Sequence, residues 1–127
     1  MKFIEINLNP LEKKTGDCSI RALMKATGDS WDRVYLKLCD IGFDLKTLPN
    51  SKETLEKYLE MTGWIRHKMP KKPSGKRYTV KQLAEERGGT MIIQVANHFT
   101  TIYKGDLYDT WDCSDKSVYN YYTLKAK

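Results

Sequence analysis

The chain has 127 residues, the size of one domain with one modest core, and we expect a single domain over residues 1–127. No apolar run reaches the roughly 18 to 20 residues of a membrane helix, and the acidic start does not resemble a signal peptide. We therefore expect a cytoplasmic protein without membrane contact, or one released without a cleaved signal. The 3 cysteines form no CxxC pair, which disfavours both a disulfide framework and a zinc site, so we expect no metal and no cofactor.

The first half of the chain predicts one short strand followed by helices. Alternating side chains over residues 2–7 favour an edge strand, which Pro10 follows. Apolar residues at helical spacing, with polar caps before them and glycines after them, predict helices over 18–26, from Ser30 to Gly42 and from Ser51 to Gly63. Cys39 lies on the apolar stripe of the second helix, so we expect it in the core.

The second half predicts mainly strands. Residues 64–68 favour a short strand, and the capping box Thr79-Val80-Lys81-Gln82 predicts a helix over 80–87. Residues rich in β-formers predict strands over 90–96, 98–104, 107–112 and 117–124. The order predicts an α+β fold, with N-terminal helices packed on a small C-terminal antiparallel sheet.

The net charge of +6 is concentrated in one segment, residues 66–77. Its basic side chains are Arg66, His67, Lys68, Lys71, Lys72, Lys76 and Arg77. This segment either attracts phosphate or an acidic partner, or is a solvated loop stiffened by prolines. No aromatic residue is interleaved within it, so a platform that stacks single-stranded bases is poorly supported.

Cys18 is the candidate nucleophile, because it stands where a turn gives way to a helix. A helix N-terminus and a nearby imidazolium both lower a thiol pKa from its usual value of about 8.5. The N–H groups of that first turn, including the one of Cys18, can also bind an oxyanion. Asp17 opposes a thiolate electrostatically unless its side chain turns back to cap the helix.

His98 is the candidate base, at the start of a predicted strand. Its ring needs an orienting partner, and the next strand offers Asp109 and Asp112. A two-residue hairpin loop places Asp109 on the His98 face, whereas the three-residue loop 104–106 places Asp112 opposite His98. Trp111 then either packs over the site or fills a buried sheet position.

The segments around these residues resemble papain-like cysteine peptidases. Asp17-Cys18-Ser19-Ile20-Arg21-Ala22 is similar to the nucleophile segment of the bacteriocin-leader (double-glycine) peptidase branch, and Asn97-His98-Phe99-Thr100-Thr101-Ile102 resembles the histidine strand. Asp109-Thr110-Trp111 resembles the family's acid segment, which favours Asp109 over Asp112. The resemblance implies a papain-like fold with a Cys18–His98–Asp109 triad, as in small bacterial or phage-encoded members.

One position departs from the family pattern. These peptidases carry a glutamine shortly before the cysteine, and its amide donates to the oxyanion, whereas position 12 is Glu12. Asn9 is the nearest amide, and it replaces the glutamine only if the intervening turn folds back. The loss of one oxyanion donor costs roughly 2.7 to 4 kcal/mol of transition-state stabilisation.

Two functions follow from these patterns. The first is a cysteine-dependent hydrolase, peptidase-like or amidase-like, acting on a peptide, isopeptide or other amide of a protein or peptide substrate. The second is a non-catalytic binding or inhibitor protein on the same fold, encoded by a phage or a bacterium. It would contact a host protein or a nucleic acid through residues 66–77 and the tyrosines from Tyr119 to Tyr122. The oligomeric state is not set by any of these patterns.

Overall fold

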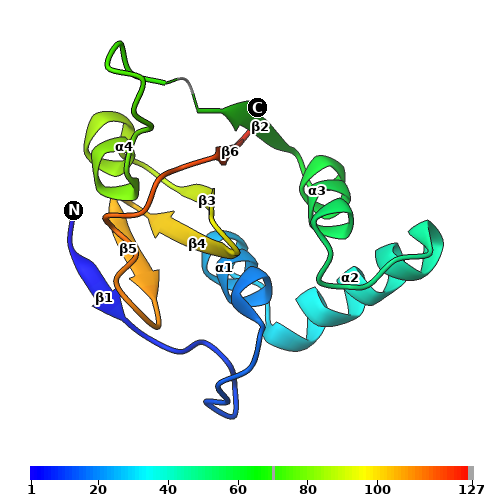
Figure 1. Cartoon of the computed structure of the whole chain (residues 1–127). Coiled ribbons are helices and arrows are strands. Elements are labelled where there is room, and N and C mark those ends of the chain that lie inside the picture. The colour runs from blue at the N-terminus through cyan, green and yellow to red at the C-terminus, as the bar shows by residue number, and fades with distance from the viewer. Residues whose placement is uncertain (70, 126–127) are drawn as a thin grey trace.

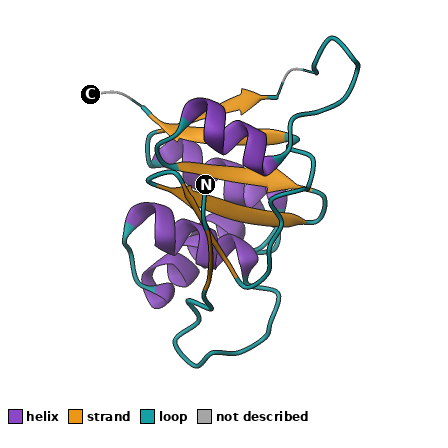
Figure 2. Ribbon diagram, turned by 90° about the vertical axis from the view of Figure 1, so that its left-hand side faces the viewer, coloured by secondary structure: helices purple, strands orange, loops and turns teal. Residues whose placement is uncertain are grey.

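A computed structural model describes residues 1–69 and 71–125 of the chain (Figure 1). Pro70, within the basic segment, and residues 126–127 lie outside the described residues. The described chain has four helices and a six-stranded mixed sheet, which confirms the α+β class. Helices cover both faces of the sheet (Figure 2).

The helices begin where the polar caps predict. Their bounds are α1 Cys18–Thr27, α2 Trp31–Leu45, α3 Lys52–Met61 and α4 Val80–Arg87. The side chains of Ser30, Ser51 and Thr79 each accept a hydrogen bond from a backbone N–H in the first turn of the helix that follows. Gln82 completes the predicted capping box at Thr79.

The second helix is longer than its sequence predicts. It continues past Gly42 to Leu45 and turns at Lys46, where φ is 59°. Gly42 does not end the helix but allows close packing instead. The chain after α2 folds back over it, and a Cβ at this position would lie 2.9 Å from the carbonyl oxygen of Thr47. Cys39 is half-buried rather than part of the core.

The six strands are β1 Phe3–Glu5, β2 Trp64–Lys68, β3 Met91–Val95, β4 His98–Tyr103, β5 Asp106–Asp109 and β6 Asn120–Leu124. Their order across the sheet is β1-β5-β4-β3-β6-β2. The expectation of an antiparallel, C-terminal sheet is wrong in two respects. β1 pairs with β5 in parallel, and two strands from the first 68 residues, β1 and β2, form the edges.

The strand predicted over 107–112 ends at Asp109, and the one predicted over 117–124 begins only at Asn120. Local hydrogen bonds turn the chain between them. The Asp112 carboxylate accepts from the backbone N–H of Ser114 at 3.0 Å, and the N–H of Lys116 donates to the carbonyl of Cys113 at 3.0 Å. Such turns compete with a ladder, which explains the shorter strands.

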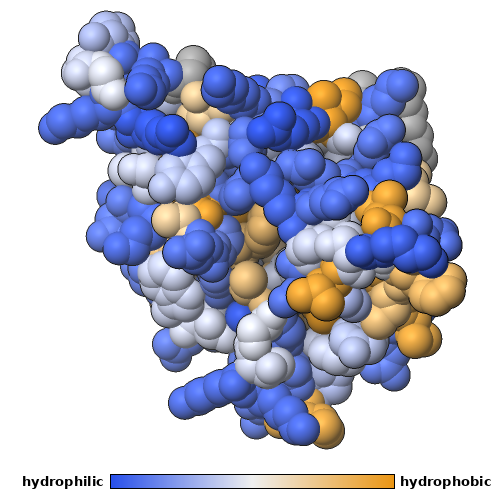
Figure 3. Space-filling view, turned by 45° about the vertical axis from the view of Figure 1, so that its right-hand side comes forward, coloured by the Kyte–Doolittle hydropathy of each residue, from blue (hydrophilic) through white to orange (hydrophobic). Residues whose placement is uncertain are grey.

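Two hydrophobic cores lie on opposite faces of the sheet. Ile92 and Tyr122 pack with residues of α1, α2 and α3, whereas their neighbours Ile93 and Tyr121 pack with residues of α4. Successive side chains of a strand point to opposite faces, so each strand serves both cores. Hydrophilic side chains cover much of the face seen in Figure 3, which is hollowed near its middle. Within residues 1–69 and 71–125, no helix combines the length and the apolar character needed to cross a bilayer.

Candidate active site

Cys18 is the first residue of α1, and a buried contact fixes this helix against β4. Thr101 Oγ1 donates a hydrogen bond of 2.7 Å to the carbonyl oxygen of Ala22. Asp17 occupies the N-cap position, but its side chain makes no cap hydrogen bond. The cap therefore leaves the N–H groups of the first turn, including that of Cys18, to bind another acceptor such as an oxyanion.

The Cys18 thiol is partly buried and interacts with the beginning of β4. Burial alone would raise its pKa. Hydrogen bonds with the His98 side chain and with the backbone N–H of Phe99 act in the opposite direction, as do the charges of His98 and Arg21. The net effect is a lowered pKa, so Cys18 holds more thiolate at neutral pH than a free cysteine does.

His98 is held by a short hydrogen bond to Asp109. Its Nε2 atom lies 2.6 Å from Asp109 Oδ2. Because Asp109 occupies Nε2, the Nδ1 atom is the one left to face Cys18. Burial alone would lower the pKa of His98, but the hydrogen bonds with Asp109, Cys113 and Cys18 and the charge of Asp109 raise it to about 11. The arrangement therefore places an imidazolium beside a thiol whose ionised form is stabilised relative to a free cysteine.

The hairpin between β4 and β5 decides which acid meets His98. Tyr103 pairs with Asp106, so the loop contains only Lys104 and Gly105, with φ of 49° and 88°. Positive φ at both positions is typical of a two-residue type I′ turn, which glycine adopts without strain. This is the register that places Asp109 on the His98 face.

Asp112, the alternative acid, lies outside this contact. Its carboxylate accepts hydrogen bonds from Ser114 and is exposed to solvent. Asp109 is instead 5% exposed, and although burial raises its pKa, the hydrogen bond from His98 contributes to a net lowering. Of the two acids, only Asp109 is in position to orient the imidazole.

Arg21 links the start of α1 to the end of β5. Its Nε atom lies 2.8 Å from Asp17 Oδ1 and its Nη1 atom lies 3.5 Å from Asp109 Oδ1. The indole Nε1 of Trp31 donates to Asp17 Oδ2 at 3.0 Å. The negative charge of Asp17 is thus balanced by Arg21 rather than used as a cap, which removes its expected opposition to a thiolate. Arg21 is not among the site residues that the sequence predicts, although its i, i+4 spacing from Asp17 signals an ion pair.

The Asn9 amide is oriented by contacts within the turn that precedes α1. The chain does fold back, but the Asn9 Nδ2 atom donates to Asp17 Oδ2 at 3.0 Å and its Oδ1 atom accepts from the N–H of Leu11 at 2.9 Å. Asn9 is 7% exposed, and its amide is held by these contacts. One Nδ2–H of Asn9 is therefore directed at Asp17, so Asn9 supports the site by positioning Asp17, and its role as an oxyanion donor stays a prediction.

Two further side chains enclose the acid and the imidazole. The ring centroids of His98 and Trp111 lie 5.0 Å apart, which confirms that Trp111 packs over the site. Cys113 is fully buried, and its Sγ atom lies 3.8 Å from Asp109 Oδ2. Both shield the hydrogen bond between His98 and Asp109 from water, which strengthens it.

His98, Asp109 and Cys113 are also the described residues whose spacing could hold a metal ion, with ligand atoms within 4.8 Å of one another. Two ligands of a tetrahedral zinc, each about 2.0 to 2.3 Å from the ion, lie more than 3 Å apart. The 2.6 Å separation of His98 Nε2 and Asp109 Oδ2 is that of a shared proton. The geometry suits acid–base chemistry better than metal binding.

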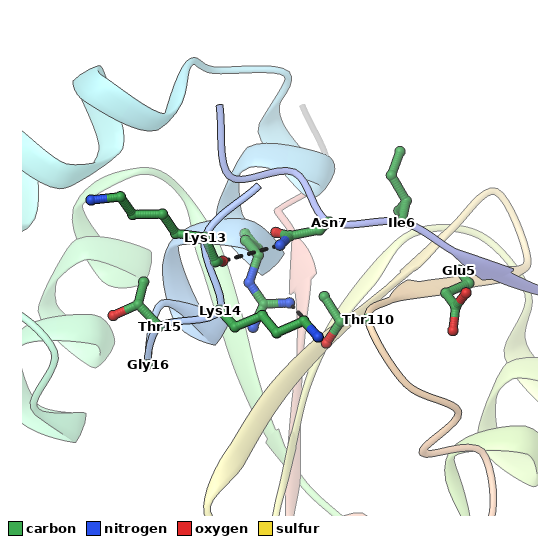
Figure 4. Close-up of a pocket in the computed structure, with 9 residues that line it drawn as sticks. Glu5, Ile6, Asn7, Lys13, Lys14, Thr15, Gly16 and Thr110 are labelled. Carbon is green, nitrogen blue, oxygen red and sulfur yellow. Dashed lines mark hydrogen bonds between the residues drawn. The ribbon is translucent and has the colours of Figure 1, made fainter. Parts of the chain in front are cut away.

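A cavity of about 710 Å³ lies beside the acid end of this site (Figure 4). Its wall is the segment that follows β1, which is closed by a 3.0 Å hydrogen bond from Asn7 Nδ2 to the carbonyl of Lys13. Arg21 and Thr110 also line it. The side chain of Lys14 extends toward Thr110 in this view. The site is therefore bordered by an open, polar space rather than by a deep apolar pocket.

The tyrosines proposed as part of a contact surface are mostly internal. Tyr121 and Tyr122 are 7% and 2% exposed, because each packs into one of the two cores. Tyr119 is the most exposed of the three, at 37%. The prediction that the whole segment from Tyr119 to Tyr122 forms a contact surface is therefore wrong.

Comparison of the chain with protein-family models, with curated proteins and with solved structures gives no match. A function for this chain can therefore be inferred only from the geometry of Cys18, His98 and Asp109. These three side chains come from α1, β4 and β5, and their contacts connect residues that are distant in the sequence.

Proposed function

We propose that the protein is a cysteine-dependent hydrolase or acyl-transfer enzyme acting on a peptide, isopeptide or other amide. The observation that carries this proposal is the 2.6 Å contact between His98 Nε2 and Asp109 Oδ2, with the Cys18 thiol close enough to His98 for the imidazole to lower its pKa. A nucleophile, a base and an orienting acid in this order form the minimal set for attack on a carbonyl carbon.

In the proposed reaction, the Cys18 thiolate attacks the carbonyl carbon and a tetrahedral oxyanion forms. The His98 imidazolium then gives its proton to the departing amine as the C–N bond breaks, which leaves a thioester on Cys18. The neutral His98 next takes a proton from water, and the resulting hydroxide attacks the thioester. Release of the acid restores the thiolate and the imidazolium, while Asp109 keeps Nδ1 directed at the sulfur.

A papain-like relationship is part of this proposal. A nucleophile at a helix start, a histidine at the first position of a strand and an acid at the end of the next strand support it. The oxyanion site differs from the family pattern, since the Asn9 amide donates to Asp17. We propose that backbone N–H groups at the start of α1 supply the oxyanion contacts, with a slower reaction as the consequence.

The missing side-chain donor also favours a second candidate, a binding protein that retains the fold without turnover. The two candidates differ in the reactivity of one thiol. Iodoacetamide alkylation of Cys18 can be followed by peptide mass spectrometry from about pH 4 to pH 10, with the half-buried Cys39 as an internal reference.

The enzyme proposal predicts that Cys18 is alkylated faster than Cys39 at about pH 6 and that the Cys18 pKa returns toward about 8.5 in the His98→Ala variant. An ordinary Cys18 pKa that does not respond to His98→Ala would reject the enzyme and direct attention to partner capture. A Cys18→Ala variant that kept full activity on any identified substrate would also exclude Cys18 as the nucleophile.

A further inference from the structure

A basic pocket lies on the sheet, apart from Cys18 and His98. It has a volume of about 560 Å³, and its lining includes four cationic side chains and no carboxylate. The four are Lys52, Arg66, Lys68 and Arg77. Three of them belong to the basic segment recognised in the sequence, whose role the proposed reaction does not explain.

Most of this positive charge is not neutralised within the protein. Lys52 pairs with Glu56, at 3.8 Å. Arg66 Nη2 donates to the neutral Asn120 Oδ1 at 3.0 Å, and within residues 1–69 and 71–125 no ion pair involves Arg66, Lys68 or Arg77. A concave surface with three uncompensated cations favours a ligand with several anionic oxygens.

The sheet register connects this pocket to the thiol. Lys68 pairs with Asn120, Asn120 pairs with Gln94, and Gln94 pairs with Phe99, across the neighbouring strands β2, β6, β3 and β4. Phe99 is the residue whose backbone N–H bonds to the Cys18 sulfur. Adjacent strands are about 4.8 Å apart, so the row from Phe99 to Lys68 spans about 15 Å.

The two sites also lie at the same end of the sheet. β3 and β2 finish near Gln94 and Lys68, while β4 and β6 begin at His98 and Asn120. An extended peptide advances roughly 3.3 Å per residue, so four or five residues would connect the thiol to the pocket. A single substrate can therefore reach both.

We propose that the basic pocket binds acidic side chains of the peptide substrate, a few residues from the bond that Cys18 attacks. This inference rests on the proposed function, because it assigns the substrate class to the same site. Arg66, Lys68 and Arg77 would hold the carboxylates. The hydrogen bond from Arg66 to the uncharged Asn120 side chain positions one guanidinium before the substrate binds.

The contacts favour an acidic peptide over a nucleic acid. The guanidinium of Arg77 lies 4.4 Å from the centroid of the Tyr119 ring, so that face of the ring is already covered and offers no platform for a base. Lys72 is turned elsewhere, with its Nζ atom 2.8 Å from Gln82 Oε1. Three cations of the basic segment, Arg66, Lys68 and Arg77, thus meet at one pocket, an arrangement that suits a compact acidic group better than an extended phosphate backbone.

The test uses the full-length Cys18→Ala protein and fluorescence anisotropy at low salt. The probe is a labelled decapeptide with four glutamates at one end and glycine and serine elsewhere, made in both orders. Its reference has glutamine in place of glutamate, and a labelled oligothymidine of ten nucleotides is the nucleic-acid probe. The pocket variant is Lys68→Gln with Arg77→Gln, and the matched control is Lys71→Gln with Lys72→Gln, which removes the same charge from the same segment.

We expect the acidic peptide to bind, the glutamine peptide to bind at least about tenfold more weakly, and the pocket variant to lose at least about tenfold in affinity. The control should lose less than about threefold, since it removes only long-range, screened attraction. Equal losses in both variants, no binding, or tighter binding of oligothymidine would overturn the proposal. Circular dichroism melting, and Lys68→Gln alone, exclude unfolding as the cause of a loss.

Protection of Cys18 links the pocket to the reaction. In the wild-type protein, the acidic peptide should slow iodoacetamide alkylation of Cys18 at least about threefold at saturation, and the pocket variant should abolish the protection. A low Cys18 pKa without peptide binding would reject the acidic-peptide inference and leave the proposed enzyme standing. Peptide binding to a protein whose Cys18 pKa is ordinary would reject the proposed enzyme and leave the peptide-binding role of the pocket standing.

Discussion

Asp17 and Asp109 are joined by one guanidinium, with Arg21 Nε 2.8 Å from Asp17 Oδ1 and Nη1 3.5 Å from Asp109 Oδ1. Asp17 precedes the nucleophile, and Asp109 orients the base. The ion pairs therefore fix the start of α1, which carries Cys18, relative to the end of β5, where Asp109 contacts His98.

Arg21→Gln should both destabilise the fold and weaken the thiolate. The buried Asp17 carboxylate would lose its ion-pair partner, which costs roughly 3 to 5 kcal/mol of unfolding free energy, whereas Asp109 would keep its pair with His98. The Cys18 pKa should rise because a favourable charge is lost. Urea unfolding and alkylation kinetics measure the two effects. Arg33→Gln, which removes an exposed ion pair with Asp29, should change stability by less than about 1 kcal/mol. Equal effects of both variants would contradict the bridging role of Arg21.

Asp109→Asn and Asp112→Asn form a matched pair that separates the two candidate acids. An amide at position 109 cannot balance an imidazolium, so the thiolate should lose its stabilisation and alkylation of Cys18 near pH 6 should slow about tenfold for each unit by which its pKa rises. Asp112→Asn should leave the rate unchanged, because that side chain contacts only its own turn. A slower rate in Asp112→Asn alone would reverse the assignment.

The protonation of His98 gives a third prediction. Its raised pKa, about 11, means that the ring remains an imidazolium through neutral pH. A raised pKa contributes stability that is complete below the usual value of about 6.5 and disappears as the pH rises toward 11. Nitrogen-15 NMR of the ring should therefore show no titration of His98 between about pH 6 and pH 9. A His98 midpoint near 6.5 in the wild type would show that the pair with Asp109 is not formed in solution.

Sequence patterns predict most of the helices and strands, because the interactions that begin and end these elements join residues close together in the sequence. The caps at Ser30, Ser51 and Thr79 and the two-residue turn at Lys104 and Gly105 depend on residues within a few positions. The turn was one of two open alternatives in the sequence, and only the register of β4 with β5 selects it.

The errors arise where distant segments meet. The parallel pairing of β1 with β5 joins residues that are about a hundred positions apart, which no local pattern encodes. The orientation of the Asn9 amide likewise depends on Asp17, Trp31 and Arg21 forming one buried polar group. Cys18 and His98 could be nominated from their settings in the sequence, and Asp109 from a family resemblance, but their contacts required the folded chain.

Gly42 offers a stability test of such a long-range constraint. Alanine would gain about 1 kcal/mol in helix propensity, but its Cβ would lie 2.9 Å from the Thr47 carbonyl oxygen, where backbone must move. Because overpacking costs roughly 1 to 3 kcal/mol, we expect Gly42→Ala to lower the unfolding free energy by about 1 kcal/mol. Gly16→Ala is the control, since a Cβ there meets nothing within 4 Å. It should change stability by less than about 0.5 kcal/mol in urea unfolding. A Gly42→Ala protein more stable than wild type would show that the loop after α2 does not pack on this helix.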